Sequence, residues 1–290
     1  MEPIVISEIP SGIWNFSSYA EMPIDRSETT VTEFLNQNNV VWKFGESSDA
    51  NLTVYKDENL RNGLISFRRM KNEYRKRFDK NPYINLNGEA QENSRISYFL
   101  ADPKRTFSVA PGNKFKRLYF PSIWSDPEID SWENRLDRIC WIGRPLRERI
   151  RLAKTIINQG IKIDIFSKTP WPLKEWRGYS ENEIQTSQNY KYRIIYENSL
   201  KNLYHSEKLF NSLKSGCITF YISDPMLKLP HLEGCYFNCI EDGIKEKYLN
   251  VDTALKRMRN LMFSDKWEVY SLKNLFSFII GCARNQSSNF

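Results

Sequence analysis

The sequence has no long apolar run and no leader-like start. Its longest apolar stretch, residues 275–282, is far shorter than the ~20 residues that a membrane-spanning helix needs. The first residues lack the basic start and the extended apolar core of a secretory signal peptide. We therefore expect neither a membrane span nor a signal peptide.

Metal-binding and nucleophilic patterns are also scarce. The five cysteines are an odd number, no two of them have the CxxC spacing of a zinc site, and only two histidines are present. This composition argues against a His/Cys metal centre and against a Ser-His-Asp triad, and it favours a reducing compartment. These residues are Cys140, Cys217, Cys235, Cys239, Cys282, His205 and His231.

Basic residues are in excess. With 42 Lys and Arg against 35 Asp and Glu, the formal net charge is +7. Such a balance favours an anionic partner, which can be nucleic acid, a phosphorylated substrate or an acidic membrane surface. The segment 68–80 concentrates this charge, and we keep two interpretations of it: a solvated helical face, or a contact for phosphate or anionic lipid.

The second half of the chain predicts repeated strand–helix–strand units. Residues 137–143 indicate a buried strand, 145–159 a helix that Gly160 ends, and 161–166 a second strand.

A second such unit follows. Residues 191–196 indicate a strand, Ser206 can cap a helix that ends near residue 215, and 217–222 indicate the next strand. Two units in series predict a parallel sheet with helices on both faces. Ligands of such sheets bind at the carboxyl ends of the strands, where residues 197–208 are expected to lie.

The first half shows weaker patterns. A helix is expected at 31–37, and 267–282 has the spacing of a helix that can pack back across both domains. The acidic and aromatic stretch 125–135 is a candidate linker. Short strands are expected at 4–7, 40–44, 52–55, 84–86 and 97–100.

The start of the helix after Ser206 has the chemistry of a diphosphate site. Its free N–H groups and the charge of Lys208 suit a diphosphate. Glu207 can accept hydrogen bonds from ribose hydroxyls, and Tyr204 can offer its ring or hydroxyl to the ligand. Charged residues are also common at helix starts, so a purely structural role stays open.

This stretch resembles the donor-binding region of the family that includes bacterial and animal α-1,3-fucosyltransferases. The family has a Phe-Glu-Asn-Ser strand end and, after a short loop, Tyr, two residues and Glu-Lys. Here these are Tyr196-Glu197-Asn198-Ser199 and Tyr204-His205-Ser206-Glu207-Lys208, with Ser206 in place of the usual Thr. The resemblance implies that Tyr204, Glu207 and Lys208 contact the sugar nucleotide, and it extends the nucleotide-binding site to Glu197, Asn198 and Ser199.

The resemblance continues upstream. Residues 149–166 are similar to a family helix that begins with a phosphate-binding arginine and leads into a Val-Asp-Val-Phe-Gly strand. Arg149 is the best match, with Arg144, Arg147 and Arg151 as alternatives. Ser167 stands where the family has glycine.

A further match supplies the catalytic base. Residues 81–89 and the strands beyond them resemble the family's Tyr-Thr-Gly-Glu-Asn segment, whose Glu is the general base. Glu89 takes this position, although the neighbouring Thr and Asn are replaced. Glu92 is the alternative, and both can instead be surface carboxylates.

The resemblance, which covers residues 80–225, implies a GT-B enzyme with two Rossmann-like domains and a cleft between them. The expected domains are an acceptor-binding domain at 1–135, a nucleotide-sugar-binding domain at 136–265 and a C-terminal helix at 266–290. The implied reaction is an inverting transfer of fucose from GDP-fucose to a hydroxyl of an oligosaccharide or glycolipid acceptor, without a metal cofactor. Another nucleotide sugar on the same fold is the nearest alternative.

These features also predict where the protein works. We expect a cytoplasmic location, with contact to the inner face of an anionic membrane left open. A lipopolysaccharide or another surface glycan is then a candidate acceptor. A non-catalytic binding protein for nucleic acid or glycan is the alternative from another class, but no recognised nucleic-acid motif is present, so we expect no nucleic-acid partner.

Overall fold

The protein is described by a computed structural model. It describes residues 2–9, 19–24, 28–45, 47–56, 72, 75–76, 82–87, 102–112, 114, 116–117, 119, 132–238, 252–262 and 264–285. The expected strand at 97–100 and the candidate bases Glu89 and Glu92 lie outside these residues, as does almost all of the basic segment 68–80.

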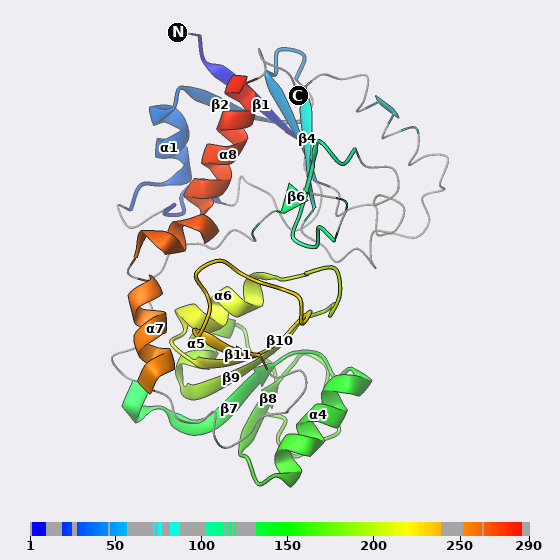
Figure 1. Cartoon of the computed structure of the whole chain (residues 1–290), viewed down its shortest axis with the longest axis vertical. Coiled ribbons are helices and arrows are strands. Elements are labelled where there is room, and N and C mark those ends of the chain that lie inside the picture. Colours follow the sequence, from blue (N-terminus) through cyan, green and yellow to red (C-terminus); the bar gives the residue numbers. More distant parts are fainter. Residues whose placement is uncertain are drawn as a thin grey trace. The chain divides into compact units, whose positions relative to one another are not determined.

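The chain forms two compact units (Figure 1). The first unit combines Met1–Trp124, Lys201–Tyr204 and Glu268–Phe290, and the second combines Ser125–Leu200 and His205–Trp267. Each unit contains one sheet in which every described strand pairing is parallel. The predicted α/β fold with two Rossmann-like domains is confirmed.

The first sheet has the strand order β2-β1-β3-β4-β5-β6. Its strands are β1 (Ile4–Ile9), β2 (Val40–Phe44), β3 (Leu52–Lys56), β4 (Tyr83–Asn87), β5 (Thr106–Ser108) and β6 (Lys116–Arg117). Helix α1 (Val31–Gln37) lies between β1 and β2 in the chain. Thr30 and Glu33 cap its N-terminus with a reciprocal capping box. The predicted helix at 31–37 and strand at 40–44 are confirmed residue for residue.

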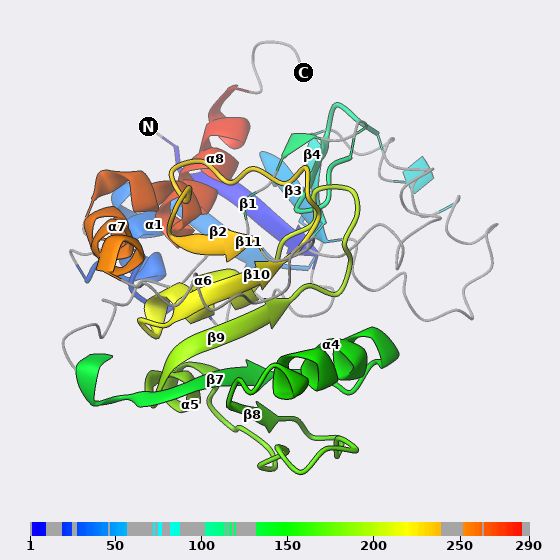
Figure 2. The same cartoon turned by 60° about the horizontal axis from the view of Figure 1, so that its bottom comes forward.

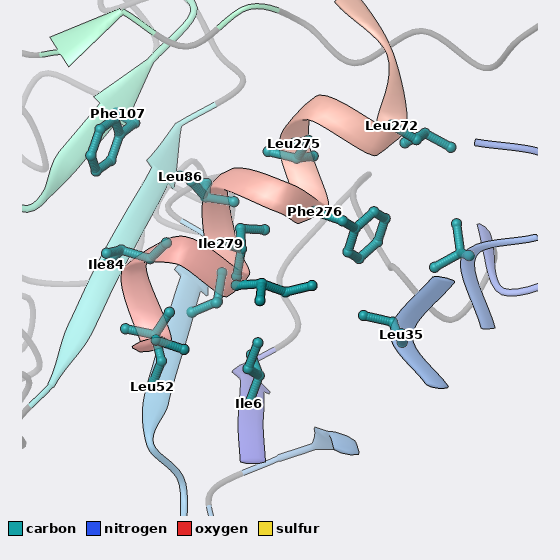
Figure 3. Close-up of a cluster of buried hydrophobic side chains, with 14 of the residues drawn as sticks. Ile6, Leu35, Leu52, Ile84, Leu86, Phe107, Leu272, Leu275, Phe276 and Ile279 are labelled. Atoms are coloured by element: carbon teal, nitrogen blue, oxygen red, sulfur yellow. The ribbon is translucent and has the colours of Figure 1, made fainter. Parts of the chain in front are cut away.

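The apolar face of the first sheet packs against the C-terminal helix α8 (Leu272–Arg284). The strand register aligns Ile6 with Leu52 and Leu86 with Phe107, so these side chains share one face. Figure 3 shows how Leu275, Phe276 and Ile279 of α8 lie against this face. The two ends of the described chain therefore build one core.

The second sheet has the strand order β11-β10-β9-β7-β8. Its elements are β7 (Leu136–Ile142), α4 (Arg147–Asn158), β8 (Ile163–Phe166), α5 (Glu183–Gln188), β9 (Tyr190–Tyr196), α6 (Glu207–Lys214), β10 (Ile218–Ile222) and β11 (Tyr236–Asn238). Helix α4 covers one face, and α5 and α6 cover the other (Figure 2). Buried Ile139, Trp141, Ile194 and Phe220 belong to the core of this unit.

The helix ends of the second unit follow their sequence signals. Ser206 caps α6 as predicted, and its side chain accepts the N–H of Lys208. Gly160 and Gly216 come after α4 and α6 with φ of 78° and 71°, a conformation that glycine adopts without steric penalty. Two helical segments precede α8. They are the α-helix α7 (Asp252–Met262) and the 3₁₀ helix Asp265–Tyr270. The predicted helix at 267–282 is thus a 3₁₀ turn followed by α8.

Candidate functional site

The second sheet has a topological switch point between β7 and β9. From β7 the chain passes through α4 to β8 on one side, and the next strand, β9, then pairs with the other side of β7. Connections that leave in opposite directions open a crevice at the carboxyl ends of the two strands, where ligands of such sheets bind. The residues that follow β7 and β9 are therefore the first candidates for a binding site.

Arg149 is bound to the end of β9 and lies near Gly143 at the end of β7. It lies in the first turn of α4, and only 3% of it is exposed. Its Nη2 donates to the backbone oxygen of Tyr196 at 3.0 Å and to Oδ1 of Asn198 at 3.2 Å, both at the end of β9. The guanidinium lies over the Tyr196 ring at 5.2 Å.

At the end of β7, Gly143 leaves room for this arginine. A Cβ atom at position 143 would lie 3.3 Å from Nη1 of Arg149, which is tighter than ordinary side-chain contacts allow. A larger residue at position 143 would therefore require the guanidinium to shift by a few tenths of an ångström.

Burial makes Arg149 a strong candidate for anion binding. Desolvation lowers the pKa of its guanidinium and the charge of Arg144 acts in the same direction, whereas Tyr196, Glu197 and Glu148 act against this shift. Arginine nevertheless stays protonated in proteins. Its Nε is buried and has no hydrogen-bond partner among the residues that the structure describes. A buried cation with only neutral hydrogen-bond acceptors favours an anionic ligand.

Burial distinguishes Arg149 from the three alternative arginines. Arg144, Arg147 and Arg151 are exposed, whereas Arg149 is buried between the two strand ends. The sequence made Arg149 the best match and left the other three as alternatives.

The first turn of α6 supplies a second cation near the end of β9. Nζ of Lys208 donates to Oγ of Ser206 at 3.0 Å and lies 3.7 Å from Oε2 of Glu197. Glu207, whose side chain is 45% exposed, has Oε1 3.8 Å from the same ammonium. The structure thus brings Glu197, Ser206, Glu207 and Lys208 together, as the sequence spacing predicted.

The remaining residues of the Glu197–Ser199 stretch differ in accessibility. Asn198 is exposed, and its Oδ1 accepts from Arg149, so its amide N–H groups point to other partners. Ser199 is buried. Asn198 is therefore the residue of this stretch that a ligand can reach most directly.

Tyr204 does not join this group. Only 3% of it is exposed, and its side chain belongs to the apolar cluster of the first unit. Asn202 and Leu203 precede it with φ of 60° and 59°, a left-handed conformation that is strained for leucine. Arg117 holds the turn by donating to the backbone oxygen of Leu203 at 2.8 Å. The contact of Tyr204 with a nucleotide stays a prediction.

Sequence reasoning missed two residues that shape the site. Tyr221 in β10 donates its hydroxyl to Glu197 at 2.9 Å, and Trp171 donates its indole N–H to the backbone oxygen of Gly143 at 2.9 Å. A signal existed for Trp171, because a tryptophan-rich loop follows β8 at the carboxyl edge of the sheet. Tyr221 sits inside an apolar strand, where nothing in the pattern marks it.

The described residues contain neither a metal-binding cluster nor a membrane-spanning helix. Within these ranges no group of His, Cys, Asp and Glu side chains is arranged to hold a metal ion. Among the described helices, none is sufficiently long and apolar to span a membrane.

These features define the class of fold, which is the Rossmann-like, two-domain GT-B fold of glycosyltransferases. A crystal structure of an α1,3-fucosyltransferase is similar over 98% of this chain and 91% of that chain, with a TM-score of 0.51 and 11% sequence identity. At this identity the likeness establishes the fold and nothing finer.

Two further solved structures give lower scores. An α1,3-fucosyltransferase determined with GDP matches over 98% of this chain and 91% of that chain, with a TM-score of 0.46 and 11% identity. WaaG, a glycosyltransferase involved in lipopolysaccharide biosynthesis, matches over 88% and 82%, with a TM-score of 0.41 and 10% identity. No family model and no curated protein matches the sequence.

Proposed function

We propose that this chain is an inverting glycosyltransferase that moves fucose from GDP-fucose to a hydroxyl of a glycan acceptor. The observation that carries the proposal is the buried Arg149 at the switch point of the second sheet, with Lys208 in the first turn of α6. The GT-B fold supports it, and so does the resemblance of residues 196–208 to fucosyltransferases.

The two cations fit the chemistry of the leaving group. When the glycosidic bond to the diphosphate breaks, negative charge grows on the leaving phosphate oxygens. Arg149, Lys208 and the N–H groups at the start of α6 would stabilise that charge. Preorganised cations of this kind can replace a metal ion, and we propose that no metal is required.

The other predicted residues receive complementary roles in this proposal. Glu207, which is exposed, would accept hydrogen bonds from the ribose hydroxyls, and Asn198 would donate to the nucleotide. Glu89 would take the proton of the attacking acceptor hydroxyl, a contribution of about 100- to 10,000-fold in rate. Glu92 is the alternative base.

The acceptor in this proposal is an oligosaccharide or glycolipid, such as a lipopolysaccharide or another surface glycan. The net charge of +7 supports work beside an anionic membrane surface on its inner face. Acceptors are therefore offered both as soluble oligosaccharides and as glycolipids in anionic vesicles.

The test measures GDP binding by calorimetry and GDP-fucose hydrolysis for the wild type, Lys208→Ala and Arg149→Lys. We expect turnover of GDP-fucose in the wild type. Each variant should bind GDP about 10- to 100-fold more weakly, because a charge-assisted contact to phosphate contributes about 1.5–3 kcal/mol. Lysine is not expected to rescue Arg149, since its ammonium lacks the planar, multi-donor guanidinium that can bind the chain and a phosphate together. Arg151→Ala, an exposed change on the same helix, is the matched control.

Each other result points elsewhere. If another nucleotide sugar is turned over instead, the donor assignment is wrong and the nearest alternative, a GT-B transferase for that sugar, replaces it. If the wild type binds no nucleotide, the proposal fails, and salt-dependent binding of nucleic acid or glycan becomes the measurement to make.

A further inference from the structure

The carboxylate of Glu197 is buried and fully engaged with its own chain. Only 1% of the residue is exposed. The carboxylate accepts the backbone N–H of Ser206 at 2.9 Å and the hydroxyl of Tyr221 at 2.9 Å. Oγ of Ser206 lies 2.7 and 3.0 Å from its two oxygens. Glu197 thus ties the end of β9 to β10 and to the start of α6.

This arrangement is unsuited to direct contact with a diphosphate. An ionised carboxylate only accepts hydrogen bonds, and so does a diphosphate, so the two groups repel each other unless a donor lies between them. The donors that surround Glu197 come from Ser206 and Tyr221. Any effect of Glu197 on an anionic ligand must therefore pass through another residue.

Ser206 connects Glu197 to Lys208. The serine hydroxyl donates its single proton to the carboxylate, and its oxygen accepts from Nζ of Lys208 at 3.0 Å. The ammonium also lies 3.7 Å from Oε2 of Glu197. Hydrogen bonds therefore run from Lys208 through Ser206 to Glu197, and Tyr221 fixes the far end.

We propose that Glu197 is a positioning residue, which orients the Ser206 hydroxyl and thereby holds the ammonium of Lys208 at the start of α6 for the diphosphate of a nucleotide. This inference rests on the proposed function and replaces the expectation that Glu197 itself contacts the nucleotide. A lysine side chain has four rotatable bonds, and holding its ammonium in one place lowers the entropy lost when the phosphate binds.

The serine hydroxyl allows a matched pair of variants. Ser206→Ala removes the atom that links Lys208 to Glu197, and Ser206→Thr keeps a hydroxyl there. Glu197→Gln keeps the size of the side chain but removes its charge. It also places an amide donor opposite groups that are themselves donors. Thermal unfolding of each variant identifies any that fails to fold, and the Ser206 pair tests the proposal without Glu197→Gln.

The readout compares GDP with guanosine, which lacks the diphosphate. We expect Ser206→Ala and Glu197→Gln to weaken GDP binding by about tenfold, with guanosine binding unchanged. Ser206→Thr should stay within about twofold of the wild type. In a Lys208→Ala background, Ser206→Ala should have no further effect, because the two residues act through one contact.

Two results would overturn this inference while leaving the proposed function intact. One is GDP binding in Glu197→Gln and Ser206→Ala at the wild-type level while Lys208→Ala is weakened. The other is an equal loss of GDP and guanosine binding in Glu197→Gln, which would mean that Glu197 contacts the nucleoside. A wild type that binds no nucleotide would overturn both the inference and the proposed function.

Discussion

Two buried charged side chains of the second unit, Asp164 and Arg149, differ in how their charges are compensated. Asp164 accepts from Arg138 at 2.9 Å and from Arg177 at 2.7 Å, so its charge is paired twice. Arg149 has only neutral acceptors and an aromatic face within reach. The two guanidinium partners of Asp164 indicate a structural role for it. The charges of Glu197 and Glu148 act on Arg149, but its buried Nε has no hydrogen-bond partner among the described residues, which makes Arg149 the better candidate for a binding role.

The buried amine of Lys214 should make the stability of the protein depend on pH. It lies buried in the last turn of α6, and burial lowers the pKa of its amine to about 8, against about 10.4 in an unfolded chain. Between these values the unfolded state binds more protons, so this residue makes the free energy of unfolding rise with pH. Below about pH 8 the full penalty of the buried charge is present.

We therefore expect Lys214→Met to gain stability relative to the wild type at low pH. The variant's free energy of unfolding minus that of the wild type should be larger at pH 7 than at pH 10, by about 1–3 kcal/mol. Urea unfolding at the two pH values measures this difference. Lys154→Met, at an exposed position on α4, is the control, and its free energy of unfolding relative to the wild type should be the same at pH 7 and pH 10. If this relative stability depended on pH to the same extent in Lys214→Met and Lys154→Met, the prediction would be refuted.

At the scale of elements, the loop after β8 holds the end of β7 in place. Trp171 bonds to the backbone oxygen of Gly143, and its ring meets Trp141 edge to face at 5.4 Å. Trp141 in turn stacks on Tyr196, with 6.5 Å between ring centroids. These aromatic side chains fix both strand ends between which Arg149 lies.

We expect Trp171→Phe to loosen this support while keeping an aromatic ring. Loss of the indole N–H leaves the Gly143 oxygen without that donor, which should lower the free energy of unfolding by about 1 kcal/mol. GDP binding should weaken about 3- to 10-fold, because Arg149 is less well placed. Trp176→Phe is the control. It loses a 3.3 Å bond to Ser167 in the same loop, away from β7. Equal GDP affinities in both variants would contradict the prediction.

The sequence predicted elements that carry their own signals. Residues 191–196 were predicted as a strand and lie within β9, and a cap with a glycine stop marked α6. It missed β11, which has only three residues, and α7, although Ala254, Leu255, Met258 and Leu261 in α7 have helical spacing. A short strand is stabilised by its neighbours in the sheet rather than by its own sequence pattern, so the sequence alone does not predict β11.

The candidate site was predicted in position but not in detail. The order of strands and the helix cap placed residues 197–208 at the carboxyl edge of the sheet. Whether Glu197 faces a ligand or the chain depends on Tyr221, which is 24 residues away. The burial of Tyr204 likewise depends on residues of the first unit. Such outcomes are set by tertiary packing, which local spacing does not encode.

At the scale of the whole molecule, the first unit depends on both ends of the described chain. Phe276 of α8 is fully buried against the sheet, and its ring meets Trp42 of β2 edge to face at 5.4 Å. The last helix therefore completes a core that the first strand begins.

We expect Phe276→Ala to destabilise this unit strongly. Truncating a fully buried phenylalanine removes its packing and leaves a cavity, which should lower the free energy of unfolding by about 3–5 kcal/mol. Urea unfolding followed by tryptophan fluorescence measures the loss. Lys273→Ala, a change at a partly exposed position on the same helix, should cost less than about 0.5 kcal/mol. A small loss in Phe276→Ala would mean that α8 is dispensable for the core.

The path of the chain between the units has a consequence for inheritance. The second unit is interrupted by Lys201–Tyr204, whose tyrosine is part of the core of the first unit. No single cut in the polypeptide separates the units, and no uninterrupted piece of the gene encodes the second unit without a fragment of its neighbour. Exchanging that unit between proteins by recombination would carry Tyr204 along, so the two halves are expected to be inherited together.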